Sequence, residues 1–425
     1  MTFFGEVFLL IYNSLIYISS SILSKSFPFL LLPLVTRLLP PEEFGKASII
    51  LLFFSVSNAF VYSNTSTYLA KNYHGKNKIE RDKIISDIIS YNCFTCVVFS
   101  FLALIFVSLS QENFTEFGFV IAVMPLVSLF FSFYQVYQTI NRFGEKPIAY
   151  AKGEILYSII GALIGVGYIF YIGKSWEYQF WAIFCSVILL GVFSLIKLMK
   201  YHGGNLRYEN LKPMFFFCAP LSFHLLGTMS LALADRLIIE RIIGAQELGI
   251  YVASYSLGMI MSVIVDAYTR AYSPYIYRVI SDKKIIYKGK INTKLRNVFS
   301  ISLILMLLLS SLFYVICYNL YYIFVGESYQ SGRDIFGYIV AGIFFQSIYK
   351  LIFPFMIKIG STFEILVINV VSAIINVILN FVLIPIYGLS GAAFATLISY
   401  SMVTFLSLLR CILGFNYLRR GDSGC

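Results

Sequence analysis

Apolar runs of membrane-spanning length constrain this chain more than any other feature of its sequence. A transmembrane helix needs about 20 consecutive apolar residues, and such runs occur here in two sets of six. They lie near residues 12–36, 47–69, 85–109, 118–140, 149–171 and 178–198, and near 213–235, 249–272, 298–318, 335–356, 362–384 and 389–411. Charged residues make up only 12% of the chain, against about 25% in soluble domains. The sequence predicts an all-α polytopic membrane protein with about 12 transmembrane helices.

A short repeat indicates that the two sets of runs are equivalent. Residues 37–45 read RLLPPEEFG and residues 241–249 read RIIGAQELG, so similar residues recur 204 positions apart. Secondary transporters are often built from duplicated halves that bind substrate near the midplane. We expect two pseudo-symmetric six-helix bundles, residues 1–205 and 206–425. Gly45 and Gly249 should allow close backbone approach at equivalent helix boundaries.

The distribution of Lys and Arg predicts the orientation. With a cytoplasmic N-terminus, inner loops and inner helix ends would hold 25 of the 32 Lys and Arg residues, as the positive-inside rule expects. The net charge of +11 is then explained by attraction to an anionic leaflet, without a nucleic-acid partner. We predict a multi-pass membrane protein with both termini in the cytoplasm.

Polar side chains inside apolar runs are candidate functional residues, because they are costly in lipid. Lys25 lies near the middle of the first predicted helix and shares a face with Ser14, Ser21 and Pro28. It either lines a cavity or pairs with a neighbouring helix. Asp235 and Arg236 end the seventh predicted helix, where interface charges are the alternative.

Three asparagines in the eleventh predicted helix share one face with Ser372. They either fasten helices together or line a hydrophilic path for sugar hydroxyls. Asp266 and Arg270, four residues apart, can form an ion pair. The candidate cavity residues are Lys25, Arg37, Lys152, Asp235, Arg236, Asn369, Asn376 and Asn380, and the candidate ion-coupling residues are Glu154, His224 and Asp235.

The sequence contains no enzyme motif. H-E-x-x-H, P-loop and G-x-S-x-G patterns are absent, and the three histidines are far apart. Cys93 and Cys96 have C-x-x-C spacing, but within an apolar run we interpret them as buried small residues. We expect neither an enzyme nor a metal or cofactor site.

Several segments together resemble a known transporter family. They are residues 29–45 (FLLLPLVTRLLPPEEFG), 234–255 (ADRLIIERIIGAQELGIYVASY), 380–400 (NFVLIPIYGLSGAAFATLISY) and 326–329 (GESY). Over nearly its whole length the chain resembles the polysaccharide-biosynthesis exporters, which are flippases for lipid-linked oligosaccharide repeat units. They belong to the multidrug/oligosaccharidyl-lipid/polysaccharide exporter superfamily.

The resemblance implies two bundles around a cationic cavity, with alternating access. The substrate would be an undecaprenyl-diphosphate-linked repeat unit of O-antigen, capsule or exopolysaccharide, moved from the inner to the outer leaflet. Membrane lipids, H+ or Na+ and the polymerase or chain-length machinery are candidate partners. Lys25 and the pair Asp235–Arg236 match the family's cavity charges, although Lys replaces the more usual Arg and lacks its bidentate fork.

Two other functions compete with the flippase. A drug/cation antiporter of the same superfamily would share the fold and could use Glu154, His224 or Asp235 as coupling residues. A polysaccharide polymerase or ligase is the alternative from another class. The absence of a long predicted outer loop argues against that enzyme.

Overall fold

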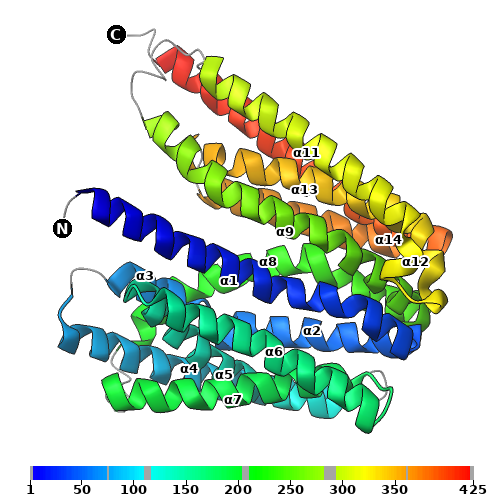
Figure 1. Ribbon diagram of the computed structural model, residues 1–425, viewed down its shortest axis with the longest axis horizontal. Coiled ribbons are helices and arrows are strands. Elements are labelled where there is room, and N and C mark those ends of the chain that lie inside the picture. Colours follow the sequence, from blue (N-terminus) through cyan, green and yellow to red (C-terminus); the bar gives the residue numbers. More distant parts are fainter. Residues whose placement is uncertain are drawn as a thin grey trace. The chain divides into compact units, whose positions relative to one another are not determined.

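The computed structural model describes residues 3–73, 76–109, 116–202, 210–281, 293–359 and 362–421, and these residues are helical almost throughout, with no strand among them (Figure 1). In chain order the elements are α1 (Phe3–Leu38), α2 (Pro41–Val61), α3 (Thr65–Tyr73), α4 (Lys78–Leu109), α5 (Gly118–Phe143), α6 (Pro147–Tyr171), α7 (Glu177–His202), α8 (Leu211–Ile243), α9 (Ala245–Ser281), α11 (Thr293–Asn319), α12 (Tyr321–Phe324), the 3₁₀ helix η1 (Glu327–Gly332), α13 (Arg333–Ile359) and α14 (Thr362–Gly421).

Ten helical stretches among the described residues are long and apolar enough to cross a membrane. The stretch Glu364–Leu413 has 50 residues, or about 75 Å of helix, which is more than twice the thickness of a bilayer core. Gly388 interrupts it with φ 57° and ψ −134°, so α14 supplies two crossings. Helix α8, with 33 residues, is long enough for another. These crossings confirm the prediction of about 12 transmembrane helices.

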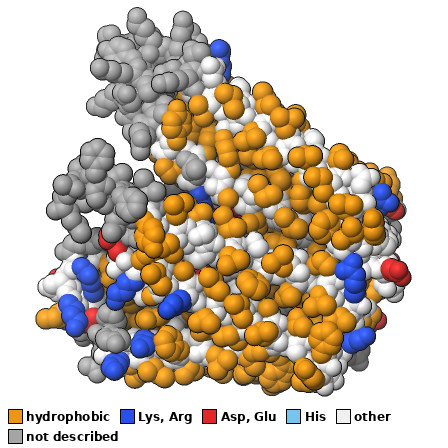
Figure 2. Space-filling view, in the orientation of Figure 1, with side chains coloured by type: hydrophobic (Ala, Val, Ile, Leu, Met, Phe, Trp, Pro, Cys, Tyr) orange, Lys and Arg blue, Asp and Glu red, His pale blue; other side chains and the backbone are white. Residues whose placement is uncertain are grey.

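The surface of these helices is suited to lipid. Large apolar side chains such as Phe101, Leu163, Ile301 and Leu308 are exposed, and Figure 2 shows hydrophobic side chains over most of the described surface on the face in view. Contiguous exposed apolar surface on this scale is rare on soluble monomers. It is the expected outer surface of a multi-pass membrane protein.

The chain forms two compact units. The first unit comprises residues 1–28 and 46–229, and the second comprises residues 29–45 and 230–425. The exchange between units occurs inside α1, α2 and α8, so a short piece of the N-terminal half belongs to the second unit. The predicted boundary at residues 205 and 206 lies outside the described residues, and the division into domains 1–205 and 206–425 stays a prediction.

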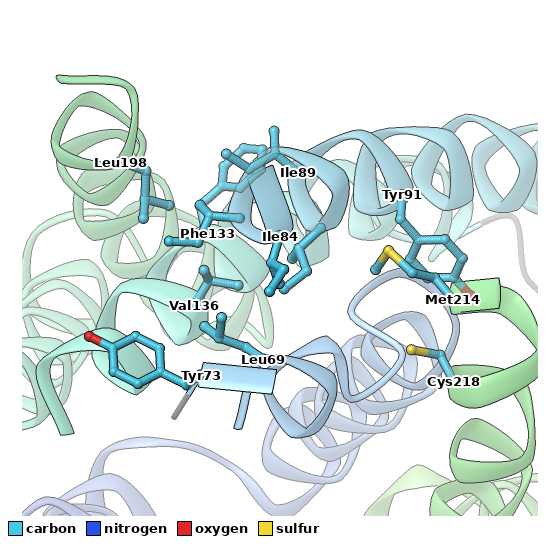
Figure 3. Packing of buried hydrophobic residues seen from close by; sticks show 12 residues of the cluster. Leu69, Tyr73, Ile84, Ile89, Tyr91, Phe133, Val136, Leu198, Met214 and Cys218 are labelled. Carbon is cyan, nitrogen blue, oxygen red and sulfur yellow. The ribbon is translucent and has the colours of Figure 1, made fainter. Parts of the chain in front are cut away.

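A cluster of buried aliphatic and aromatic side chains holds the first unit together (Figure 3). Leu69 of α3, Ile84 of α4, Val136 of α5, Leu198 of α7 and Cys218 of α8 are all members. Five helices therefore share one core. Cys218 is a small buried residue there, the environment that we predicted for the cysteines.

The two copies of the repeated motif contact each other within the second unit. Helix α2 begins at Pro41 and α9 begins at Ala245, again 204 residues apart. A Cβ atom built on Gly45 would lie 2.8 Å from the backbone nitrogen of Gly249, and one built on Gly249 would lie 2.5 Å from the carbonyl carbon of Pro41. Neither atom fits, which confirms the predicted close approach at both glycines. The contact is reciprocal, as it is at two-fold interfaces.

Candidate functional site

Lys25 is an exposed cation in the middle of a membrane-spanning helix. It belongs to the span Leu15–Leu38 of α1 and makes no hydrogen bond or ion pair with any residue that the structure describes. Pro28 is also exposed and Ser21 half-buried, while the side chain of Ser14 lies outside the described residues. An unpaired charge in a span must face water or a charged ligand rather than lipid. Within the part of the chain that the structure describes, the alternative of a lysine paired with a neighbouring helix is not observed.

Helix α6 packs against α1 beside this lysine. The Ser158 hydroxyl donates to the carbonyl oxygen of Ser24 at 3.1 Å and lies 3.2 Å from the carbonyl oxygen of Glu154. The same small side chain thus contacts the residue before Lys25 and one of the predicted ion-coupling residues. The structure brings Lys25 and Glu154 to the same region of the first unit.

The Glu154 carboxylate is half-buried and is held from helix α5. Its Oε1 accepts a hydrogen bond from the Tyr134 hydroxyl at 3.1 Å and lies 3.5 Å from Nε2 of Gln138. Gly153 makes room for the amide, because a Cβ atom there would lie 2.8 Å from Cδ of Gln138. Sequence reasoning missed Tyr134 and Gln138 because they lie on another helix, 20 and 16 residues before Glu154.

Aromatic rings surround this carboxylate. The Tyr134 and Tyr157 rings stack with centroids 5.6 Å apart and an interplanar angle of 22°. Phe131 contacts both rings, at 6.1 Å and 6.2 Å, and Tyr62 packs edge-on against Phe131. We call Phe131, Tyr134, Gln138, Glu154 and Tyr157 the aromatic–acid cluster. Tyr134 and Gln138 are buried, whereas Phe131, Glu154 and Tyr157 are half-buried, so the accessible members offer two rings and a carboxylate, groups that a sugar ring can use.

Lys152 and Arg37 are placed differently from Lys25. Lys152 is exposed near the start of α6. Arg37 donates to the carbonyl oxygens of Pro33 and Ile323, both at 2.7 Å. The guanidinium of Arg37 therefore binds backbone at the end of α12, and this favours a structural role.

Asp235 and Arg236 are buried in the second unit, with 1% and 7% of their surfaces exposed. These charges are therefore enclosed by protein rather than exposed at its surface. Asp235 Oδ2 accepts a hydrogen bond from the Tyr251 hydroxyl at 2.5 Å, and that hydroxyl lies 3.4 Å from the Thr396 hydroxyl. Asp235 Oδ1 has no hydrogen-bond partner among the described residues. A buried carboxylate with one free oxygen and two neighbouring hydroxyls is suited to receiving a cation or a proton.

The asparagine face of α14 is buried. Asn369, Asn376 and Asn380 are at most 5% exposed. Asn369 donates to the Tyr349 hydroxyl of α13 at 3.1 Å, and Asn380 donates to Oδ1 of Asn376 at 3.0 Å. Asn369 therefore fastens α14 to α13, whereas the bond between Asn376 and Asn380 lies within α14. Asn376 Nδ2 and Asn380 Oδ1 have no hydrogen-bond partner among the described residues, so for these two residues both alternatives stay predictions. The side chain of the remaining candidate, His224, lies outside the described residues.

Two ion pairs join helices of the second unit. Asp266 binds Lys350 at 2.7 Å, so its predicted partner Arg270 is wrong. Glu364 accepts two hydrogen bonds from Arg410, both at 2.8 Å. Asp266 thus joins α9 to α13, and Glu364 joins the two arms of α14 on either side of Gly388. Among the described residues no group of three or more His, Cys, Asp or Glu is arranged to hold a metal ion.

The family model and the curated relatives that match this chain point to the same family. A family model described as "Polysaccharide biosynthesis protein" matches residues 10–280. The "Capsular polysaccharide biosynthesis protein CapF" of Staphylococcus aureus is 24% identical over 414 residues, which cover 90% of this chain and 96% of that protein. These matches agree with the resemblance drawn from the motifs.

Two solved structures share the fold. The inward closed conformation of the lipid II flippase MurJ aligns with a TM-score of 0.77 at 15% identity, covering 96% of this chain and 90% of that chain. The inward-facing conformation of a multidrug resistance MATE family transporter of the MOP superfamily aligns with a TM-score of 0.71 at 14% identity, covering 93% and 96%. They confirm the predicted all-α polytopic fold.

Proposed function

Because the chain belongs to the polysaccharide biosynthesis protein family, we propose that it is a flippase for undecaprenyl-diphosphate-linked oligosaccharide repeat units. It moves them from the inner to the outer leaflet of the bacterial inner membrane by alternating access. The fold shared with a lipid II flippase supports this proposal. The activity is transport, and no enzymatic step is required of the chain.

Lys25 is the observation that carries the proposal. A bare diphosphate cannot cross hydrocarbon, because burying an unpaired charge is very costly. A fixed cation midway along a span lowers that cost, provided that no protein carboxylate already neutralises it. Lys25 meets this condition among the described residues. Its compact ammonium supplies a point charge, without the two parallel hydrogen bonds that the planar guanidinium of an arginine can donate.

We assign ion coupling to Asp235. Its carboxylate is buried, has one oxygen without a hydrogen-bond partner among the described residues, and is joined to Tyr251. Binding of H+ or Na+ would neutralise it. The change in net charge would alter the stability of the surrounding helices. An Asp235→Asn variant should bind substrate yet lose the dependence of transport on the ion gradient.

The test of Lys25 is complementation of surface glycan in a strain that lacks the gene. Lys25→Arg should retain most export, Lys25→Ala should lose at least about tenfold and Lys25→Glu should export least, while all three accumulate normally in the membrane. The lipid-linked intermediate should build up on the inner leaflet. Lys174→Ala, which removes an exposed lysine beyond the end of α6, is the control. Full export by Lys25→Ala would refute the proposed role.

A drug/cation antiporter is the second candidate function, favoured by the fold shared with a multidrug transporter. An unpaired lysine in a span argues against organic cations as substrates, since like charges repel. Drug susceptibility distinguishes the two functions. An antiporter would change the growth inhibition caused by cationic dyes, and a flippase would change only surface glycan.

A further inference from the structure

The charge of Glu154 has no role in the diphosphate contact proposed above. The carboxylate lies within the span Pro147–Tyr171 and stays half-buried. A charged group in a span is costly unless it has a partner or a function. Its hydrogen-bond donors are neutral, namely the Tyr134 hydroxyl and the Gln138 amide.

The second unit shows that helix packing does not require this charge. Tyr349 and Asn369 of the second unit lie 215 residues after Tyr134 and Glu154 of the first. This spacing differs from the 204 residues between the two copies of the repeated motif. Both pairs are separated by 20 residues and both bonds are 3.1 Å long. In the second unit a neutral, buried amide holds the tyrosine. The carboxylate in the first unit is therefore more than a fastening group, and its partial exposure makes it accessible to a ligand.

The aromatic–acid cluster and Lys25 belong to neighbouring parts of α6 and α1 in the first unit. Ser158 contacts both the backbone beside Lys25 and the backbone of Glu154, so the two charges serve one region of the first unit. This proximity of α1 and α6 is the ground for placing the sugar of a diphosphate-linked ligand beside the half-buried members of the aromatic–acid cluster. Tyr157 and Phe131 are half-buried and can contact the apolar face of a sugar ring.

The chemistry of a carboxylate decides which sugars it accepts. Ionised Glu is an acceptor only, so it takes hydrogen bonds from hydroxyl and amide groups and binds an ammonium strongly. A second carboxylate at short range is repelled, and juxtaposed like charges cost several kcal/mol. Neutral and amino sugars fit beside Glu154, whereas uronic and sialic acids do not.

We propose that the aromatic–acid cluster is a saccharide subsite that selects repeat units whose diphosphate-linked sugar is neutral or carries an amino group. Glu154 is the residue that excludes a carboxylate from this position. The inference rests on the proposed flippase function, because it places the sugar relative to a diphosphate on Lys25. It assigns Glu154 to substrate selection rather than to ion coupling.

The test measures binding to the purified full-length protein in lipid nanodiscs. Three ligands are compared: undecaprenyl diphosphate alone, the same lipid with one N-acetylhexosamine, and the same lipid with one hexuronic acid. The wild type should bind the N-acetylhexosamine lipid at least about tenfold more tightly than the hexuronic acid lipid. Glu154→Gln keeps an acceptor for Tyr134 and should reduce that ratio to below about threefold. The Kd of both proteins for the lipid without sugar is measured as the reference, so that any effect of Glu154→Gln on the diphosphate contact is separated from its effect on the sugar.

A matched control exists where the other end of α6 meets α7, the helix that carries Glu177. Tyr168 of α6 donates to Glu177 at 2.6 Å, so Glu177→Gln alters a similar pair at another position and should leave the ratio at the wild-type value. Equal binding of both sugars by the wild type would overturn the inference, as would an unchanged ratio in Glu154→Gln. Failure of the flippase proposal looks different, because then no lipid diphosphate would bind.

Discussion

The two copies of the repeated motif share their glycines but not the use of their arginines. Gly45 and Gly249 make reciprocal backbone contacts. Both arginines are exposed. Arg37 donates to the carbonyl oxygens of Pro33, Tyr322 and Ile323, whereas Arg241 has no hydrogen bond or ion pair to any part of the chain that the structure describes. Where the copies contact each other their geometry is the same. Where each copy contacts other segments, the neighbouring residues determine which hydrogen bonds its arginine makes.

The surroundings of the first copy are the residues between α11 and α13. Gly326 donates its backbone N–H to the Thr36 hydroxyl at 3.0 Å, and the Tyr329 hydroxyl donates to the carbonyl oxygen of Leu39 at 2.9 Å. A Cβ atom on Gly326 would lie 2.8 Å from the Thr36 carbonyl carbon. The end of α1 is thus held by a segment of the C-terminal half. Substitutions in the two copies can therefore separate the shared geometry from the local contacts.

The largest expected effect is at the two glycines. Gly45→Leu and Gly249→Leu each force a side chain into backbone, so each should destabilise the protein by at least about 3 kcal/mol and lower its membrane abundance several-fold. Immunoblotting of membranes measures this. Gly167→Leu is the control, since nothing lies within 4 Å of a Cβ atom there. Normal abundance of Gly249→Leu beside loss of Gly45→Leu would disprove the equivalence.

The arginines should behave unequally. Arg37→Ala removes charge-assisted hydrogen bonds to carbonyls and should cost about 1–2 kcal/mol, whereas Arg241→Ala should stay within about 0.5 kcal/mol of the wild type. Thermal unfolding of the detergent-solubilised protein gives the difference in Tm. The Tm of Arg37→Lys should fall between those of the two alanine variants, because an ammonium cannot bind the carbonyls of Pro33 and Ile323 together as a guanidinium does. Equal shifts for both alanine variants would contradict the structural difference.

The smallest effect is expected at the Tyr329 hydroxyl. Tyr329→Phe leaves the carbonyl of Leu39 without this donor and should cost about 1 kcal/mol in the same thermal assay. Tyr322→Phe removes an exposed hydroxyl from a neighbouring position and should have no measurable effect. A larger loss in Tyr322→Phe would mean that this segment is held by other contacts.

The apolar runs predicted the helices well because lipid leaves few alternatives for the backbone. The main boundary error is the run at 47–69, where α2 ends at Val61 and α3 starts at Thr65. Ser63 and Asn64 have positive φ values of 46° and 53° there. Asn tolerates this conformation, but the apolar residues on both sides hide the break from a hydropathy analysis. Hydropathy averages over such a two-residue break.

From the sequence, only those residues of the candidate site that place a charge inside an apolar run could be predicted. Lys25 and Asp235 were found because a charge inside an apolar run is conspicuous. Thr396 is uncharged, so the sequence does not mark it as a candidate. It lies 145 residues from Tyr251 along the chain and comes next to the Tyr251 hydroxyl only through folding. Asp266 was given the wrong partner for the same reason, because spacing along one helix cannot reveal Lys350 on another.

The positive φ of Gly388 also bears on how the protein is oriented in the membrane. Because one residue makes the whole turn inside α14, its two arms are joined without a loop. With no loop between them, the two arms have linked orientations in the membrane.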